Sequence, residues 1–224
     1  MVNIGEKMDN VTISEVLIKR NKRVCTSKDI AELTSEKEYL KKISSLINTN
    51  WIVPVGFRGI YYVKDPEERS RSFLKLDNFQ ILNKVLNIAF GDEWYFGRIT
   101  SLSLSGRIHQ PVSTYYILNK RFSRTFTSDI LGKVFLMKTS AGISGKCGIL
   151  AKKHAGETFY LCSIERNIAD YIYSYVHSPA DKKQIAEMCR KYLPDKEKLV
   201  DTIIRCYPRA SAIKMVSIVK EVYQ

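Results

Sequence analysis

Residues 51–63 read WIVPVGFRGIYYV, and this stretch decides how the first third of the chain is interpreted. Apolar, β-branched and aromatic residues fill 51–55 and 60–63, a composition that predicts two strands. Between them, residues 56–59 read Gly-Phe-Arg-Gly, which is typical of a turn. The stretch therefore predicts a β-hairpin with a basic residue, Arg58, at its tip.

Three helices are expected before this hairpin, over residues 11–21, 28–33 and 36–48. Each range has apolar residues near helical spacing. Thr26 or Ser27 can cap the second helix, and Ser35 can cap the third. The apolar stripe expected on the third helix comprises Tyr39, Leu40, Ile43, Leu46 and Ile47. Three helices followed by a hairpin are the order of elements in a winged helix-turn-helix domain, whose recognition helix enters the major groove of DNA. We therefore predict a DNA-binding domain of this kind over residues 1–68.

The remainder, residues 69–224, is predicted to form a mixed α/β domain that finishes in helices. A polar, proline-marked segment at 65–72 is interpreted as a linker between the two domains. Strands are predicted at 114–118, 133–138, 147–151 and 158–162, and helices at 76–90, 99–105, 164–176, 181–192, 196–206 and 210–222. The expected fold class of the whole chain is thus α+β.

The composition points to an anionic partner. The chain carries 36 Lys and Arg residues against 23 Asp and Glu residues, which gives a formal net charge of +13. Such a charge attracts polyanions, so nucleic acid is the expected partner class, ahead of an anionic membrane surface. The five cysteines lack C-x-x-C spacing, which argues against a disulfide framework and a structural zinc site. No uncharged apolar run approaches the roughly 18 residues of a membrane span, so we expect a cytoplasmic protein without membrane contact. His109, His154 and His177 are isolated and no carboxylate cluster has metal-ligand spacing, so we expect neither a metal nor a cofactor.

The candidate DNA-binding residues lie on the second and third predicted helices and at the hairpin tip. Lysines of the third helix can neutralise phosphates, and its short polar residues can meet base edges. The full set is Ser27, Lys28, Lys37, Lys41, Lys42, Ser44, Ser45, Asn48 and Arg58. The alternative for the helical residues is an ordinary solvated face, and for Arg58 a turn residue that serves solubility.

Further charged residues occur in the second predicted domain. Basic residues follow two of its strands, at Lys120, Arg121, Arg124, Lys152 and Lys153. They form a candidate surface for DNA, for RNA or for an acidic protein, and the sequence does not separate the three. Arg166 and Asp170 are spaced i and i+4, so we expect them to pair on one helix face as an architectural feature.

Four stretches carry a family resemblance: residues 26–31 (TSKDIA), residues 46–61 around the hairpin, residues 95–117, and residues 165–171 (ERNIADY) followed by Pro179. In this order they resemble the motifs of the AbiEi antitoxins and transcriptional regulators, from type IV abortive-infection toxin-antitoxin systems. The hairpin departs from the family pattern, because Asn50 replaces the usual Gly and Pro54 or Val55 stands where an Arg is common.

The resemblance implies a DNA-binding transcriptional repressor and antitoxin. Its winged-helix domain is expected to bind double-stranded DNA at its own promoter. Its C-terminal domain is expected to counteract a nucleotidyltransferase-like toxin, without catalytic activity. A homodimer on the DNA is the further expected assembly.

Two other functions stay open. The first is a nuclease that a winged helix delivers to DNA, with Asp129, Glu157 and Lys146 as a carboxylate and lysine site. The second is a winged-helix transcription factor with no toxin. Residues 140–147 do not support phosphate or acyl chemistry, because they lack a glycine and a hydroxyl of the Walker loop and the second glycine of a nucleophile elbow.

Overall fold

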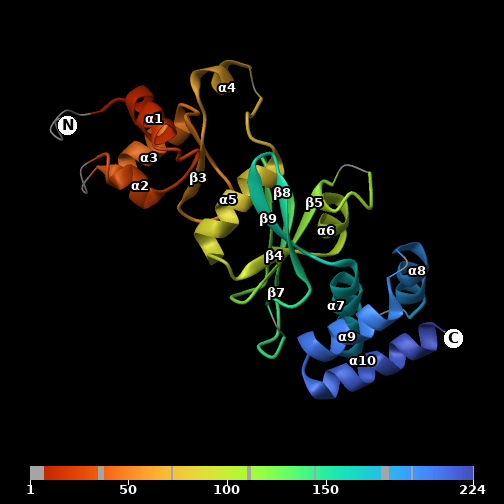
Figure 1. The fold of residues 1–224 in the computed structure, drawn as a ribbon. Helices are drawn as coiled ribbons and strands as arrows, with labels where there is room; N and C mark the ends of the chain where they lie inside the picture. The colour runs from red at the N-terminus through yellow and green to blue at the C-terminus, as the bar shows by residue number, and fades with distance from the viewer. Residues whose placement is uncertain are drawn as a thin grey trace. The chain divides into compact units, whose positions relative to one another are not determined.

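The computed structural model describes residues 8–34, 38–71, 73–109, 112–143, 145–177, 182–192 and 194–223. It has the predicted α+β class, with the helices and strands labelled in Figure 1. The chain divides into two compact units, residues 1–89 with 126–132 and residues 90–125 with 133–224. The boundary predicted after residue 68 therefore falls inside the first unit.

The first unit begins with three helices and a small sheet. Its elements are α1 (Asn10–Lys19), β1 (Val24–Thr26), α2 (Ser27–Ala31), α3 (Tyr39–Asn48), β2 (Ile52–Pro54) and β3 (Ile60–Val63). The described residues place β3 between β1 and β2, antiparallel to both, with Cys25 opposite Tyr61 and Val53 opposite Tyr62. The three predicted helices and the hairpin are thus present, and β1 is a strand that the sequence did not predict. Ser35, the predicted cap of α3, lies outside the described residues.

The helices of the first unit pack against this sheet through one apolar core. Residues fully or nearly fully buried in it include Ile13 and Leu17 of α1, Ile43 and Leu46 of α3, and Val63 of β3. Burying a side chain of this size contributes roughly 2 kcal/mol. The same apolar periodicity that predicted the helices therefore fixes which of their faces point inward, and which remain outside.

The segment interpreted as a linker is instead folded. Residues 66–71 form α4 (Pro66–Arg71), and α5 (Asn78–Phe90) follows. The Asp65 carboxylate accepts a hydrogen bond from the Glu68 N–H at 3.0 Å, and the Glu68 carboxylate accepts one from the Asp65 N–H at 2.9 Å. This reciprocal capping box starts the helix, and proline is favoured at its first position. The linker prediction was wrong because these acidic residues cap a helix and do not simply solvate a loop.

The second unit contains most of a mixed sheet. Its elements are β4 (Trp94–Phe96), α6 (Arg98–Leu104), β5 (Thr114–Asn119), β7 (Gly132–Lys138), β8 (Ile149–His154) and β9 (Glu157–Cys162), and β6 (Arg124–Ser128) completes the sheet. The order in the described residues is β6-β7-β5-β4-β9-β8. β5 runs parallel to β7 and β4 parallel to β9, whereas β4–β5 and β8–β9 are antiparallel. The four predicted strands are present, but β4 and β6 were not predicted.

Four helices finish the second unit, as the sequence predicted. They are α7 (Ile164–His177), α8 (Lys182–Tyr192), α9 (Lys196–Cys206) and α10 (Arg209–Val222). α7, α9 and α10 lie side by side and share a core that contains Ile172, Leu199 and Met215 (Figure 1). The helical end of the chain is therefore a packed bundle with its own core.

One disulfide contradicts the expectation that the cysteines stay unpaired. Cys147, in the loop before β8, is bonded to Cys206 at the end of α9, with their Cα atoms 5.5 Å apart. Spacing rules did not predict it because the two residues are 59 positions apart in the sequence and meet only through the fold. Cys25, Cys162 and Cys189 are free and buried.

Candidate nucleic-acid interface

A capping box and the hairpin turn fix the start of α2. The Thr26 hydroxyl accepts a hydrogen bond from the Asp29 N–H at 3.2 Å, and the Asp29 carboxylate accepts one from the Thr26 N–H at 2.7 Å. The Ser27 N–H donates to the Gly59 carbonyl at 2.8 Å. Ser27 therefore contacts the turn that carries Arg58, whereas Lys28 is exposed on α2.

α3 presents three of the predicted DNA contacts on one exposed face. Lys41, Ser44 and Asn48 are exposed, and their spacing of i, i+3 and i+7 aligns them along the helix. The opposite face, with Ile43, is buried in the core. Leu40, which was predicted for the apolar stripe, is instead 63% exposed. The outward face of α3 thus combines one cation and two short polar groups with an apolar residue.

Two other predicted contacts turn toward α1. The Lys42 ammonium donates to the Met8 carbonyl at 2.7 Å. The Ser45 hydroxyl accepts a hydrogen bond from the Asn10 side-chain amide at 2.9 Å. Both side chains are half-buried and hold α3 to the start of α1, so they do not share the exposed face. Lys37 lies outside the described residues.

The hairpin turn exposes Arg58 and buries its neighbour. Gly56 has a positive φ of +86°, and a Cβ built on it would lie 2.1 Å from the Phe126 ring. Phe57 is buried, and its ring meets that of Phe126 edge to face with centroids 5.3 Å apart. The apolar side of the turn is therefore covered, and Arg58 is exposed beside it.

Not all basic residues of the first unit face solvent. Arg23 donates to the Asp65 carboxylate at 2.8 Å and pairs with the fully buried Glu68 at 2.5 Å. Burial alone raises the pKa of Asp65, but hydrogen bonds from Lys75, the Glu68 N–H and Arg23 outweigh it and hold that pKa well below its usual range. Arg23 is thus a structural cation that anchors α4.

The predicted pair of Arg166 and Asp170 is confirmed in the second unit. The fully buried Arg166 donates through Nε to the Asp170 carboxylate at 3.1 Å, through Nη2 to the Tyr95 hydroxyl at 2.9 Å, and through Nη1 to the Cys147 carbonyl at 2.8 Å. The Tyr207 hydroxyl also donates to Asp170, at 2.5 Å. Burial raises the pKa of Asp170, and the charge of Arg166 opposes that rise. The network joins β4, α7 and the end of α9, which is an architectural role.

The structure does not bring Glu157 and Lys146, two of the residues proposed for a nuclease site, close together. Glu157 faces His154 at the tip of the β8–β9 hairpin, whereas Lys146 precedes the other end of β8. The intervening strand spans roughly 16 Å at about 3.3 Å per residue. Asp129 belongs to the first unit. Among the described residues, no group of three His, Cys, Asp or Glu side chains is placed to hold a metal ion.

Several side chains of the candidate basic surface in the second unit are engaged in contacts within that unit. The Lys120 ammonium donates to the Ile143 carbonyl, and the Lys152 ammonium donates to the Leu104 carbonyl. Arg121 lies 3.9 Å from the Glu93 carboxylate. These side chains therefore bind partners within their own unit. The predicted DNA-binding residues that are exposed together lie on α3 and at the hairpin turn.

The comparisons with known proteins bear on the fold alone. The RV2827C protein from Mycobacterium tuberculosis has a similar crystal structure, with a TM-score of 0.58 and 14% sequence identity, over 94% of this chain and 75% of that one. No family model and no curated protein sequence matches the chain. In the described part of the chain, no helix has the length and apolar character needed to cross a membrane.

Proposed function

We propose that the chain is a DNA-binding transcriptional repressor that reads its own promoter through α3. The exposed row of Lys41, Ser44 and Asn48 carries this proposal. The order α1, β1, α2, α3, β2, β3 and the antiparallel β1-β3-β2 sheet support the proposal, because a winged helix-turn-helix domain has three helices and a hairpin in this order, and we assign α3 as its recognition helix.

Each exposed group has a role in this proposal that follows from its chemistry. Lys41 neutralises a phosphate, and Ser44 and Asn48 meet base edges in the major groove. Arg58, exposed at the hairpin turn, contacts a phosphate or the adjacent minor groove. Ser27 and Lys28 lie at the start of α2 beside the hairpin turn, and the exposed Lys28 neutralises a phosphate. Lys42 and Ser45 support this face by holding α3 to α1.

The antitoxin half of the proposal comes from the resemblance to the AbiEi family. In it, the second unit counteracts a nucleotidyltransferase-like toxin in the cytoplasm, and two copies of the chain bind the promoter together. Winged-helix regulators that bind as dimers read two half-sites spaced by a helical turn of DNA, so the operator is expected to be a pseudo-palindrome.

Fluorescence anisotropy with the full chain tests the DNA half. The probes are a duplex from the chain's own upstream region and a scrambled duplex of equal composition, each titrated between about 50 and 200 mM salt. We expect tighter binding to the upstream duplex, with an affinity that falls steeply as salt rises, because each phosphate contact releases counterions. Equal affinity for both duplexes, or an affinity insensitive to salt, would contradict the proposal.

A matched pair of charge reversals tests the role of α3. Lys41→Glu is expected to weaken binding at least about tenfold and to reduce the salt slope by about one phosphate contact. Lys214→Glu changes the net charge equally, at an exposed position of α10 in the second unit, and is expected to leave both quantities nearly unchanged. Equal losses in the two variants would mean that binding responds only to net charge.

A growth assay tests the antitoxin half separately. The chain is expressed together with a nucleotidyltransferase encoded beside it, and growth is compared with that of cells expressing the toxin alone. We expect restored growth, and we expect Lys41→Glu to restore it equally because DNA binding is not required. Absence of rescue by the unmodified chain would favour a transcription factor without a toxin.

A further inference from the structure

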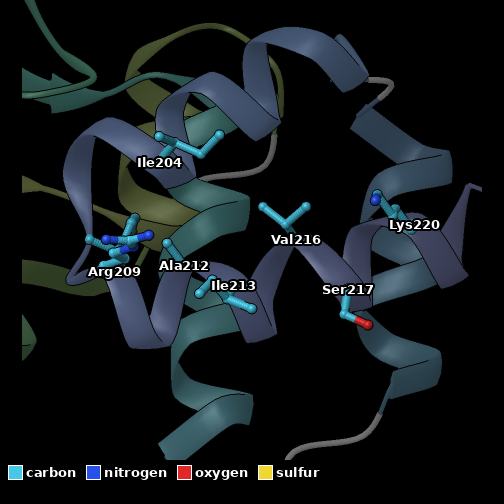
Figure 2. Close-up of a pocket in the computed structure, with 8 residues that line it drawn as sticks. Ile204, Arg209, Ala212, Ile213, Val216, Ser217 and Lys220 are labelled. Atoms are coloured by element: carbon cyan, nitrogen blue, oxygen red, sulfur yellow. The ribbon is translucent and has the colours of Figure 1, made fainter.

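The second unit carries an apolar groove between α9 and α10, shown in Figure 2. Its volume is about 740 Å³, and its apolar lining includes Ile204 from α9 and Ile213 and Val216 from α10. Ile213 is 65% exposed and Ile204 is 61% exposed. Isolated exposed apolar residues are ordinary, so the case for an interaction surface rests on how these two are arranged with their neighbours in one groove.

The apolar surface of α10 extends beyond the part that the core of the unit covers. Met215, Ile218 and Val219 are buried against the neighbouring helices. Ile213 is offset from this buried row by nearly half a turn and is exposed, whereas Val216 is half-buried at the edge of the row and packs against the same core. The core of the unit therefore accounts for Val216 but not for the exposure of Ile213, which faces solvent like Ile204 of α9.

The residues of α10 that line the groove have the spacing of a helix-packing seam. Arg209, Ile213, Val216 and Lys220 follow one another at intervals of four, three and four residues. This is the interval pattern with which one helix packs along another. The row spans about 16 Å at 1.5 Å per residue, which matches a partner helix of about three turns.

The ends of the groove are positively charged. Arg209 and Lys220 line it at opposite ends of the row in Figure 2, with Ile213 and Val216 between them. Both cations are exposed, and neither forms an ion pair within the described part of the chain. Two nearby acids are already engaged, Asp201 with Arg205 at 3.1 Å and Glu221 with Lys182 at 3.0 Å. No acidic residue lines the groove.

We propose that this groove binds an amphipathic helix of a partner protein that carries acidic residues at both ends of a short apolar stripe. Charge complementarity selects this occupant over a second copy of the chain. If two copies packed through this row, cations would meet cations whether the helices ran parallel or antiparallel. The inference goes beyond the proposed function, because it assigns a protein-binding surface in the second unit and does not rest on DNA binding.

Two synthetic peptides probe the groove with the full chain. The first is a fluorescent helical peptide of about three turns with leucines at the four-three-four spacing and glutamates at both ends. The second is identical except that lysines replace the glutamates. We expect the acidic peptide to bind at least about tenfold more tightly, because like charges across an interface are strongly unfavourable. Equal binding of the two peptides, or binding of neither, would overturn the proposal.

Variants locate the site and reverse its preference. Ile213→Asp is expected to weaken acidic-peptide binding at least about tenfold, since it places a charge in the centre of the apolar row. The combined change Arg209→Glu with Lys220→Glu is expected to favour the basic peptide. Lys214→Glu, exposed on α10 but not lining the groove, serves as the control and is expected to change neither affinity.

Circular dichroism and thermal unfolding confirm that each variant is folded before binding is compared. Sedimentation at several concentrations then tests the rival occupant. A dimer that Ile213→Asp dissociates would assign the groove to a second copy and would overturn the proposal. Unchanged DNA affinity in Ile213→Asp would keep this result separate from the test of α3.

Discussion

Gly56 shows how one position without a side chain supports the candidate interface. Its φ of +86° disfavours any residue with a Cβ, and the added carbon would lie 2.1 Å from the Phe126 ring. Gly156 in the β8–β9 turn has a similar φ of +80° but no atom within 4 Å of an added Cβ. We expect Gly156→Ala to cost about 1 kcal/mol of unfolding free energy, and Gly56→Ala clearly more, because it adds a clash to the same backbone penalty. Thermal and urea unfolding of the two variants measures the difference, and equal losses would mean that Phe126 moves aside freely.

Asp65 makes the first unit sensitive to acid. Hydrogen bonds from Lys75 at 2.7 Å and from Arg23 at 2.8 Å keep its pKa in the folded state below the unfolded value of about 3.9. A carboxylate whose pKa is lowered by folding contributes stability that is present above the unfolded pKa and is lost as the pH falls through the folded pKa. We therefore expect the unfolding free energy to decrease below about pH 4, with a shallower decrease in Asp65→Asn. Thermal unfolding across a pH series measures this. Asp201→Asn, which alters an exposed pair, is the control expected to keep the wild-type slope.

The Cys147–Cys206 disulfide joins the loop before β8 to the end of α9. It closes a loop of 59 residues, for which the chain-entropy relation gives a stabilisation of about 4 kcal/mol. We expect a reducing agent to lower the melting temperature of the unmodified chain, and Cys206→Ser to melt lower and to lose any response to the reductant. Cys189→Ser removes a free thiol and is expected to keep that response. An unmodified chain that melts at the same temperature with and without reductant would contradict this prediction.

The sequence predicts long elements better than short ones. α10 was predicted over 210–222 and runs from Arg209 to Val222, because fourteen residues give an amphipathic period several turns to appear. β1 and β4 contain three residues each, too few for the alternation that identifies a strand. α4 did have a local signal, since an Asp, a Pro and a Glu at Asp65, Pro66 and Glu68 are typical of a capped helix start.

In the candidate site too, the sequence predicts what depends on neighbouring residues and misses what depends on residues far apart in the chain. Helical spacing was enough to place Lys41, Ser44 and Asn48 on one face of α3. Helical spacing could not predict that Lys42 and Ser45 turn away from this face. Their hydrogen-bond partners, Met8 and Asn10, lie in or just before α1, more than thirty positions earlier in the sequence. The disulfide, and the contacts of the Arg166–Asp170 pair with Tyr95, Cys147 and Tyr207, are likewise made by residues that only the tertiary fold brings together.

The net charge of the whole molecule overstates the number of cationic side chains that are available to bind a polyanion. The formal value is +13, yet the half-buried Arg23 and the fully buried Arg166 are engaged in ion pairs, and Lys120 and Lys152 donate to main-chain carbonyls. Among the described residues of the predicted interface, the exposed cations are Lys28, Lys41 and Arg58. Under the proposed function, specific affinity for DNA would depend on a few placed groups, while the total charge would chiefly raise the rate of encounter.

The two proposed surfaces lie in different units, so their effects on binding are expected to be independent. Lys41→Glu changes α3 of the first unit, and Ile213→Asp changes α10 of the second, and the two residues share no partner among the described residues. The double variant is therefore expected to lose DNA affinity as Lys41→Glu does and peptide affinity as Ile213→Asp does, each within about 0.5 kcal/mol of the single variant. Anisotropy with the promoter duplex and with the acidic peptide measures both quantities on the same samples. A loss of DNA affinity in Ile213→Asp alone would instead couple the groove to promoter binding, through a dimer that forms across α10.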